Sequence, residues 1–232
     1  MPGQDIQIQG PDGSFSAYLA KPASGQGPGI VVLQEIFGVN DVMRGHCDQL
    51  AAAGFTAICP DLFWRIEPGI QISDKTDEEL AQAFDLFGKF DVDAGMVDIK
   101  ATIDALRSHE ASNGKVGAMG YCLGGLLAYL TACHTDSDAT VGYYGVSIQD
   151  RLADAKGIKN PLMLHIAGQD EFVPAEAQAA MHAGLDNHPQ VQLHDYPDMD
   201  HAFARTDGRH YNAEQARIAD TRTLDFFKAN LG

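Results

Sequence analysis

One stretch decides the fold: residues 115–125 have the sequence KVGAMGYCLGG. Its short apolar part, residues 116–119, is typical of a buried strand, and residues 123–133 have the small and apolar side chains of a packed helix. Between the two, Cys122 has Gly120 and Gly124 two residues away on either side. A residue on so sharp a strand-to-helix turn lies in strained backbone, and glycines beside it allow strand and helix to approach closely. The stretch therefore predicts a βα unit with Cys122 at the bend.

Cys122 is a candidate nucleophile. Its place at the start of a helix favours the thiolate over the thiol, because the helix dipole is positive at that end. The Gly-x-Cys-x-Gly pattern between strand and helix is the nucleophile elbow of the α/β-hydrolases, with cysteine in place of the usual serine. The alternative is an inert core cysteine, since free cysteines are commonly buried. The partners of Cys122 decide between the two.

Composition narrows the class of protein. The 16 basic and 32 acidic side chains give a net charge of −16, which argues against nucleic acid or an anionic membrane as partner. No apolar run follows Met1, and no stretch is long and apolar enough to span a membrane. The four cysteines are scattered without a C-x-x-C pair, so we expect a reduced, cytoplasmic enzyme without a disulfide framework or a zinc site.

The order of patterns along the chain predicts the architecture. An antiparallel hairpin is expected at residues 6–9 and 16–20, followed by a loop at 24–29. Strands are then expected at residues 30–33, 55–59, 116–119, 139–144, 161–166 and 191–196. Helices are expected at residues 41–53, 77–88, 93–109, 123–133, 174–185 and 212–229. Alternation of strand and helix predicts a doubly wound, mostly parallel sheet in a single α/β domain, residues 1–232, with the hairpin at one edge. Residues 61–76 lack periodicity, which is typical of a lid or a pocket wall.

Two further residues fit a catalytic triad in type, order and position. Asp170 follows the strand at 161–166, and His201 follows the strand at 191–196, so both are expected at the carboxyl edge of the sheet. In the α/β-hydrolase order, the acid and then the histidine follow the nucleophile. Alternatively, Asp170 caps a turn. Of the nine histidines, His165 and His182 are expected to be structural, because one lies in a strand and the other on a helix.

The loop after the first parallel strand completes the site. In this architecture that loop donates one backbone N–H to an oxyanion, and the residue after the nucleophile donates the other, so Ile36 and Leu123 are the expected donors. Glu35 is expected to face the thiol across the crevice. The alternative is a solvent-exposed loop acid, which the apolar residues around Glu35 disfavour.

The chain resembles the dienelactone hydrolases (carboxymethylenebutenolidases) over nearly its whole length. The resemblance is densest at residues 34–40 (QEIFGVN), 59–62 (CPDL), 113–117 (NGKVG), 120–125 (GYCLGG), 141–145 (VGYYG), 168–174 (GQDEFVP) and 201–205 (HAFAR). It implies an α/β-hydrolase fold and a monomer that needs no cofactor. It also implies a reaction that opens a cyclic enol-lactone carrying a carboxylate.

The resemblance also implies roles for particular residues. Cys122 matches the nucleophile, His201 the base and Asp170 the acid that orients it. Glu35 matches a glutamate that holds the resting thiol and helps to deprotonate it, and Arg205 matches an arginine that engages the substrate carboxylate. The pocket residues implied are Phe37, Tyr143 and Phe84.

The chain departs from the family at four places. Leu80 stands where a second carboxylate-binding arginine is familiar, and Phe84 and Phe87 stand where a tyrosine and a tryptophan are. Ala202 replaces a serine after the histidine. A bidentate arginine–carboxylate contact contributes about 1.5–3 kcal/mol, so these changes bear on the substrate more than on the chemistry. We expect a cysteine-dependent lactone hydrolase; the alternatives are an esterase or thioesterase for neutral substrates and a hydrolase scaffold that only binds ligand.

Overall fold

The computed structural model describes residues 3–232. The chain forms two compact units, Met1–Gly117 and Ala118–Gly232, and each is described by itself. The prediction of a single domain over residues 1–232 stays a prediction.

The first unit is built on four strands in the order β1-β2-β4-β3. Strands β1 (Gln4–Gly10) and β2 (Gly13–Ala20) form the predicted antiparallel hairpin at one edge. β2 also pairs antiparallel with β4 (Thr56–Pro60), which in turn pairs parallel with β3 (Gly27–Leu33). The strand β3 begins at Gly27, so the loop expected at residues 24–29 is wrong in its second half.

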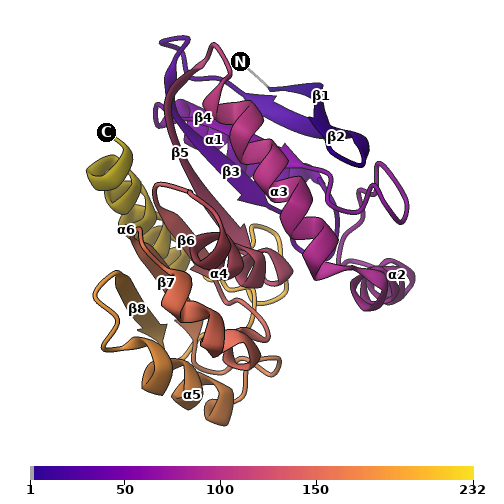
Figure 1. Ribbon diagram of the computed structural model, residues 1–232. Coiled ribbons are helices and arrows are strands. Elements are labelled where there is room, and N and C mark those ends of the chain that lie inside the picture. The colour runs from indigo at the N-terminus through magenta and orange to yellow at the C-terminus, as the bar shows by residue number, and fades with distance from the viewer. Residues whose placement is uncertain (1–2) are drawn as a thin grey trace. The chain divides into compact units, whose positions relative to one another are not determined.

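Helices cover the first unit's strands. Four successive residues of β3, Ile30 to Leu33, are fully buried, so both faces of this strand are covered. Helix α1 (Asp41–Ala52) and helix α3 (Val92–Arg107) pack on β3, and α3 crosses in front of the strands of its unit in Figure 1. Helix α2 (Asp77–Lys89) begins after Thr76, whose side chain accepts a hydrogen bond from the Glu79 N–H.

The second unit continues with parallel strands in the order β5-β6-β7-β8. β5 (Ser112–Tyr121) starts in the first unit, and β6 (Thr140–Tyr143), β7 (Leu162–Ala167) and β8 (Val191–Tyr196) follow. The helices are α4 (Leu123–His134), α5 (Ala175–Leu185) and α6 (Ala213–Leu231). A 3₁₀ segment, η1 (Ile148–Gly157), was not predicted, because its sequence has no clear apolar period.

Neighbouring residues of β6 show that this unit is covered on both faces. A Cβ added to Gly142 would lie 3.1 Å from the carbonyl oxygen of Gly125 in α4. The hydroxyl of the next residue, Tyr143, lies 2.7 Å from Oγ1 of Thr223 in α6. Because successive side chains of a strand point to opposite faces, α4 and α6 cover opposite faces of the strands. With its parallel strands, edge hairpin and helices on both faces, the chain has the predicted doubly wound α/β-hydrolase fold.

The irregular segment at residues 61–76 is fastened to the loop that follows β3. Gly38 and Gln71 form an antiparallel bridge, the N–H of Ile72 donates to the Phe37 carbonyl (3.1 Å), and the Asn40 amide donates to the Ile72 carbonyl (2.9 Å). Gly38 has φ 74°, and a Cβ there would collide with the Ile70 carbonyl. Only glycine therefore fits at this close approach.

Candidate active site

Cys122 lies at the bend between β5 and α4. Its backbone has φ 57° and ψ −114°, a conformation that costs a residue with a side chain about 1–3 kcal/mol. Its N–H donates to the Tyr143 carbonyl (3.1 Å), and its carbonyl accepts from the Gly125 N–H (2.9 Å). The neighbouring strand and the first turn of the helix thus hold the strained bend in place.

A tight approach at this bend lies at Gly125. A Cβ there would lie 2.6 Å from both the Cα of Gly145 and the carbonyl oxygen of Tyr143. The second glycine of the Gly-Gly pair in the elbow therefore lets α4 pack closely against the end of β6.

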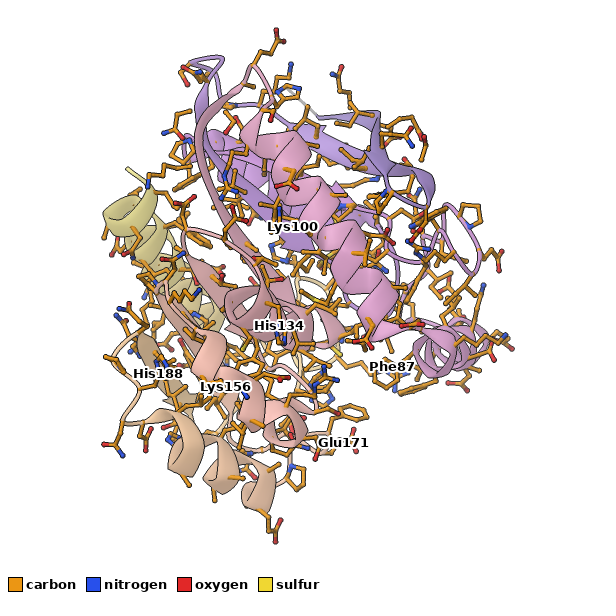
Figure 2. All side chains as sticks on the ribbon, viewed as in Figure 1. Phe87, Lys100, His134, Lys156, Glu171 and His188 are labelled. Atoms are coloured by element: carbon orange, nitrogen blue, oxygen red, sulfur yellow. The ribbon has the colours of Figure 1, made fainter. Side chains whose placement is uncertain are left out.

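Asp170 and His201 meet at the carboxyl ends of β7 and β8. Oδ2 of Asp170 lies 2.7 Å from Nδ1 of His201, and the residues are 4% and 7% exposed. Oδ1 of Asp170 accepts from the Phe172 N–H (2.9 Å), which fixes the carboxylate. The next residue along the chain, Glu171, lies at the surface (Figure 2). Asp170 thus caps the turn at residues 170–172 with one carboxylate oxygen and contacts the imidazole of His201 with the other.

His201 is held by aromatic rings as well. Tyr144 and Phe172 each make an edge-to-face contact with the imidazole, with ring centroids 5.1 and 4.9 Å away. Tyr144 is buried, whereas Phe172 is 45% exposed. Reasoning from sequence missed both residues. The signal for Phe172 was its place two residues after the acid, within the quoted stretch at 168–174.

The electrostatics of the site join Cys122 to His201. Burial lowers the pKa of His201, but the Cys122 charge and the hydrogen bonds to Asp170 and Cys122 outweigh it and raise the pKa to about 10. A thiolate on Cys122 and the Asp170 carboxylate thus both favour the protonated imidazole. The structure brings Cys122, Asp170 and His201 together as one hydrogen-bonded group in the second unit, with the Leu123 N–H next to Cys122 along the chain.

Three of the expected residues lie in the first unit, in the loop after β3. Glu35, Ile36 and Phe37 are 2%, 7% and 4% exposed. Glu35 is therefore not a solvent-exposed loop acid. The side chain of the preceding residue, Gln34, fixes this loop because its Oε1 accepts from the Leu62 N–H (2.9 Å).

The remaining expected residues have varied surroundings. Arg205 is partly buried one turn after His201, and its N–H donates to the carbonyl of Ala202 (2.9 Å), which has a left-handed φ of 63°. On α2, Phe84 and Phe87 are 45% and 38% exposed, and Figure 2 labels Phe87.

Tyr143 lies elsewhere than expected. It is fully buried, and its hydroxyl is bonded to Asp220 and Thr223 on α6, so its side chain is part of the packing between β6 and that helix. We therefore withdraw it as a pocket residue. The adjacent Tyr144, whose ring lies against His201, is the tyrosine of this pair at the site.

The other cysteines are buried and none of the four is in a disulfide: Cys47, Cys59 and Cys133 lie in the interior. In the part of the chain from residue 3 onward, no helix is long and apolar enough to cross a membrane. Within the same residues, no group of three or more histidine, cysteine or acidic side chains is arranged to hold a metal ion.

Comparison with known proteins identifies the family. The sequence profile of the "Dienelactone hydrolase family" matches residues 15–231. A carboxymethylenebutenolidase of Pseudomonas putida is 42% identical over 224 residues, which are 96% of this chain and 95% of that protein. A protein of Azospirillum brasilense, provisionally named a carboxymethylenebutenolidase, is 49% identical over 231 residues, 98% of this chain and 99% of the other.

Among solved structures, a protein from Klebsiella pneumoniae provisionally named a dienelactone hydrolase superposes with a TM-score of 0.85 at 25% identity, covering 97% of this chain and 98% of that one. The profile match, the related sequences and the shared fold extend over almost the entire chain. The protein therefore belongs to the dienelactone hydrolase family and is a hydrolase.

Proposed function

We propose that the protein opens a carboxylate-bearing enol-lactone through a thioester on Cys122. The observation that carries the proposal is the buried group formed by Cys122, His201 and Asp170, in which the sulfur and the carboxylate both raise the pKa of His201. A thiolate paired with an imidazolium is an activated nucleophile with a general acid and base at hand. Relatives named carboxymethylenebutenolidase support the lactone as substrate class.

The proposed acylation follows from the chemistry of a thiolate. The sulfur of Cys122 attacks the lactone carbonyl, and the N–H groups of Leu123 and Ile36 stabilise the oxyanion. When the tetrahedral intermediate collapses, the C–O bond of the ring breaks, a thioester forms, and the enolate that leaves takes the proton of the His201 imidazolium. An enolate is a good enough leaving group for this step. An alkoxide is not, because the thiolate would be expelled first, so ordinary alkyl esters should be poor substrates.

Deacylation uses the same imidazole. His201, neutral after it has given up its proton, takes a proton from water, and the hydroxide formed attacks the thioester. Asp170 keeps the ring oriented through its bond to Nδ1, so that Nε2 faces the reaction. The thiolate of Cys122 leaves, and the free acid is released.

Glu35 and Arg205 receive their roles from the family resemblance. We propose that Glu35 holds the resting thiol and that an anionic substrate, bound by Arg205, releases Glu35 toward the sulfur. The burial of Glu35 supports a role other than that of a surface acid. If so, Glu35→Gln should make the alkylation rate of Cys122 independent of a substrate analogue, whereas the analogue should accelerate alkylation in the wild type.

The substrate carboxylate is tested at Arg205. Arg205→Ala should lower kcat/KM for a carboxylated enol-lactone by about tenfold to a hundredfold, because a charge-assisted contact of about 1.5–3 kcal/mol is lost. The same change should leave a neutral enol-lactone nearly unaffected. Arg209→Ala, at an exposed position four residues on, is the matched control. Equal losses on both lactones would reject the carboxylate role.

A second candidate is an esterase or thioesterase that acts on neutral substrates with the same triad. It is favoured by the apolar residues of α2, where Leu80 is accompanied by Phe84 and Phe87. The ratio of kcat/KM for a carboxylated enol-lactone to that for a neutral aryl ester separates the two: a ratio well above one supports the first proposal. We further propose a monomeric, cytoplasmic enzyme, which sedimentation and cell fractionation would test.

A further inference from the structure

A chain of buried polar side chains lies between α6 and the strands β6, β7 and β8, outside the triad. Its centre is His165, which is 1% exposed. Nδ1 of His165 lies 2.8 Å from the Tyr196 hydroxyl, and Nε2 lies 3.0 Å from Oγ1 of Thr223. Oγ1 of Thr223 lies 2.7 Å from the Tyr143 hydroxyl, which is 3.0 Å from Oδ1 of Asp220.

The hydrogen bonds between these side chains all run in one direction from donor to acceptor. Burial raises the pKa of Asp220 to about 6, so the carboxylate is ionised at neutral pH and accepts the proton of the Tyr143 hydroxyl. The Tyr143 oxygen then accepts from the Thr223 hydroxyl. Because the Thr223 hydrogen is used in that bond, its oxygen accepts from Nε2–H of His165.

The other half of the chain agrees with this direction. Nη1 of Arg222 donates to the Tyr196 oxygen (3.0 Å), which leaves the Tyr196 hydrogen for Nδ1 of His165. Burial lowers the pKa of His165 well below its ordinary value, and the nearby charges of His194 and Arg222 lower it further. The imidazole is therefore neutral with its proton on Nε2, and every bond points from the guanidinium toward the carboxylate.

The residues of this hydrogen-bonded chain also contact the candidate active site through their backbone and rings. The carbonyl of Tyr143 accepts the N–H of Cys122 (3.1 Å). The carbonyl of His165 accepts the N–H of Tyr144 (2.7 Å), and the ring of Tyr144 lies against His201. Two of the strands that the buried chain ties to α6, β6 and β7, are thus also bonded to Cys122 and to the tyrosine that lies against His201.

We propose that this chain of hydrogen-bonded side chains positions Cys122 and His201 for the reaction, with Thr223 as its central link. None of its side chains is assigned to substrate contact, so they act as positioning residues and not as catalytic ones. Thr223 is the central link because its hydroxyl bonds both the β6 tyrosine and the β7 histidine and so ties these paired strands to α6. Without it, Nε2–H of His165 loses its acceptor, Tyr143 keeps only its bond to Asp220, and α6 can shift against the strand ends.

The test removes the hydroxyl and keeps the volume. Thr223→Val should lower kcat per active site by about tenfold or more with KM nearly unchanged, because small misplacements of reacting groups are costly. Thr223→Ser should restore most of kcat, because it restores the hydroxyl. The matched control is Thr221→Val on the same helix, where the hydroxyl bonds only to the Arg217 carbonyl (2.7 Å) at the surface and kcat should not change.

The readout separates positioning from stability. Active sites are titrated by the acyl burst with an activated aryl ester, so an unfolded fraction is not counted, and the alkylation rate of Cys122 is measured in parallel. The inference rests on the proposed function. Absence of a burst in the wild type would overturn that function. A normal burst with unchanged kcat per site in Thr223→Val would overturn the positioning role alone.

If Thr223→Val does not fold, Asp220→Asn decides, because it keeps an acceptor for Tyr143 but removes the charge that directs the hydrogen bonds. A lower kcat per site in Asp220→Asn supports the inference, and a wild-type value overturns it.

Discussion

Two buried histidines of the second unit differ in what surrounds them. His201 and His165 are 7% and 1% exposed, and burial lowers the pKa of both. His201 faces the Cys122 sulfur and the Asp170 carboxylate, and its pKa is raised to about 10. His165 faces two hydroxyls and its pKa is lowered. The charge of the partners, more than burial, therefore decides whether the pKa of a buried imidazole is raised or lowered.

The largest expected effect follows from removing the sulfur of Cys122, which lies beside His201. Cys122→Ala should reduce turnover of activated aryl esters and enol-lactones by on the order of 10⁴-fold or more and abolish the acyl burst, as loss of a nucleophile does elsewhere. Cys133→Ala, on α4 but within the protein interior, should keep the burst and serves as control. Wild-type turnover in Cys122→Ala would reject the assignment.

Removing the negative charge behind His201 is the next largest change. Asp170→Asn should lower kcat by about 10²- to 10⁴-fold, because the ring loses the partner that fixes its tautomer and orientation. The control is Asp200→Asn, whose carboxylate meets His210 in an exposed pair (3.1 Å). Stopped-flow kinetics on the two variants would contradict this account if both lost activity equally.

The protonation of His201 can be observed directly. Imidazole nitrogen NMR should show that His201 titrates at a higher pH than His165, which stays neutral. In Cys122→Ala the sulfur that helps to raise the pKa of His201 is gone, so the signal should titrate at a lower pH. A His201 that titrates no higher than His165 would remove the distinction between the two histidines.

The smallest expected effect is on stability, and it concerns His165. Its pKa is lowered in the folded state, so below about pH 6.5 the unfolded chain binds a proton at His165 that the folded chain does not, and stability falls as the pH falls. Urea unfolding between pH 8 and pH 5 should therefore show a smaller loss of stability in His165→Gln than in wild type. His188→Gln, in a loop, should follow the wild-type curve; a steeper acid loss in His165→Gln would contradict the assignment.

The sequence predicted the elements well and singled out the three residues that the structure brings together, because both are governed by local patterns and by chain order. Strand, bend and helix around Cys122 follow from apolar runs and glycines, and Asp170 and His201 follow from their places after two buried strands. These positions require no knowledge of how side chains pack.

What the sequence could not predict depends on side-chain direction. Tyr143 and Tyr144 are adjacent and identical in type, and only the backbone decides which of them faces α6 and which faces His201; Tyr144 has φ 37° where the chain leaves β6. The buried chain around Thr223 was missed for a similar reason, since it joins α6 to strands far away in the sequence. The 3₁₀ segment η1 has no periodicity that a sequence pattern could register.

The central claim is that the sulfur beside His201 carries the acyl group during turnover. The most direct measurement is rapid-quench mass spectrometry during hydrolysis of an activated aryl ester, followed by peptide mapping. We predict an acyl adduct on the peptide that contains Cys122, formed within the burst and lost as the substrate is exhausted. An adduct on another residue, or turnover without any adduct in a variant slowed at deacylation, would contradict the account.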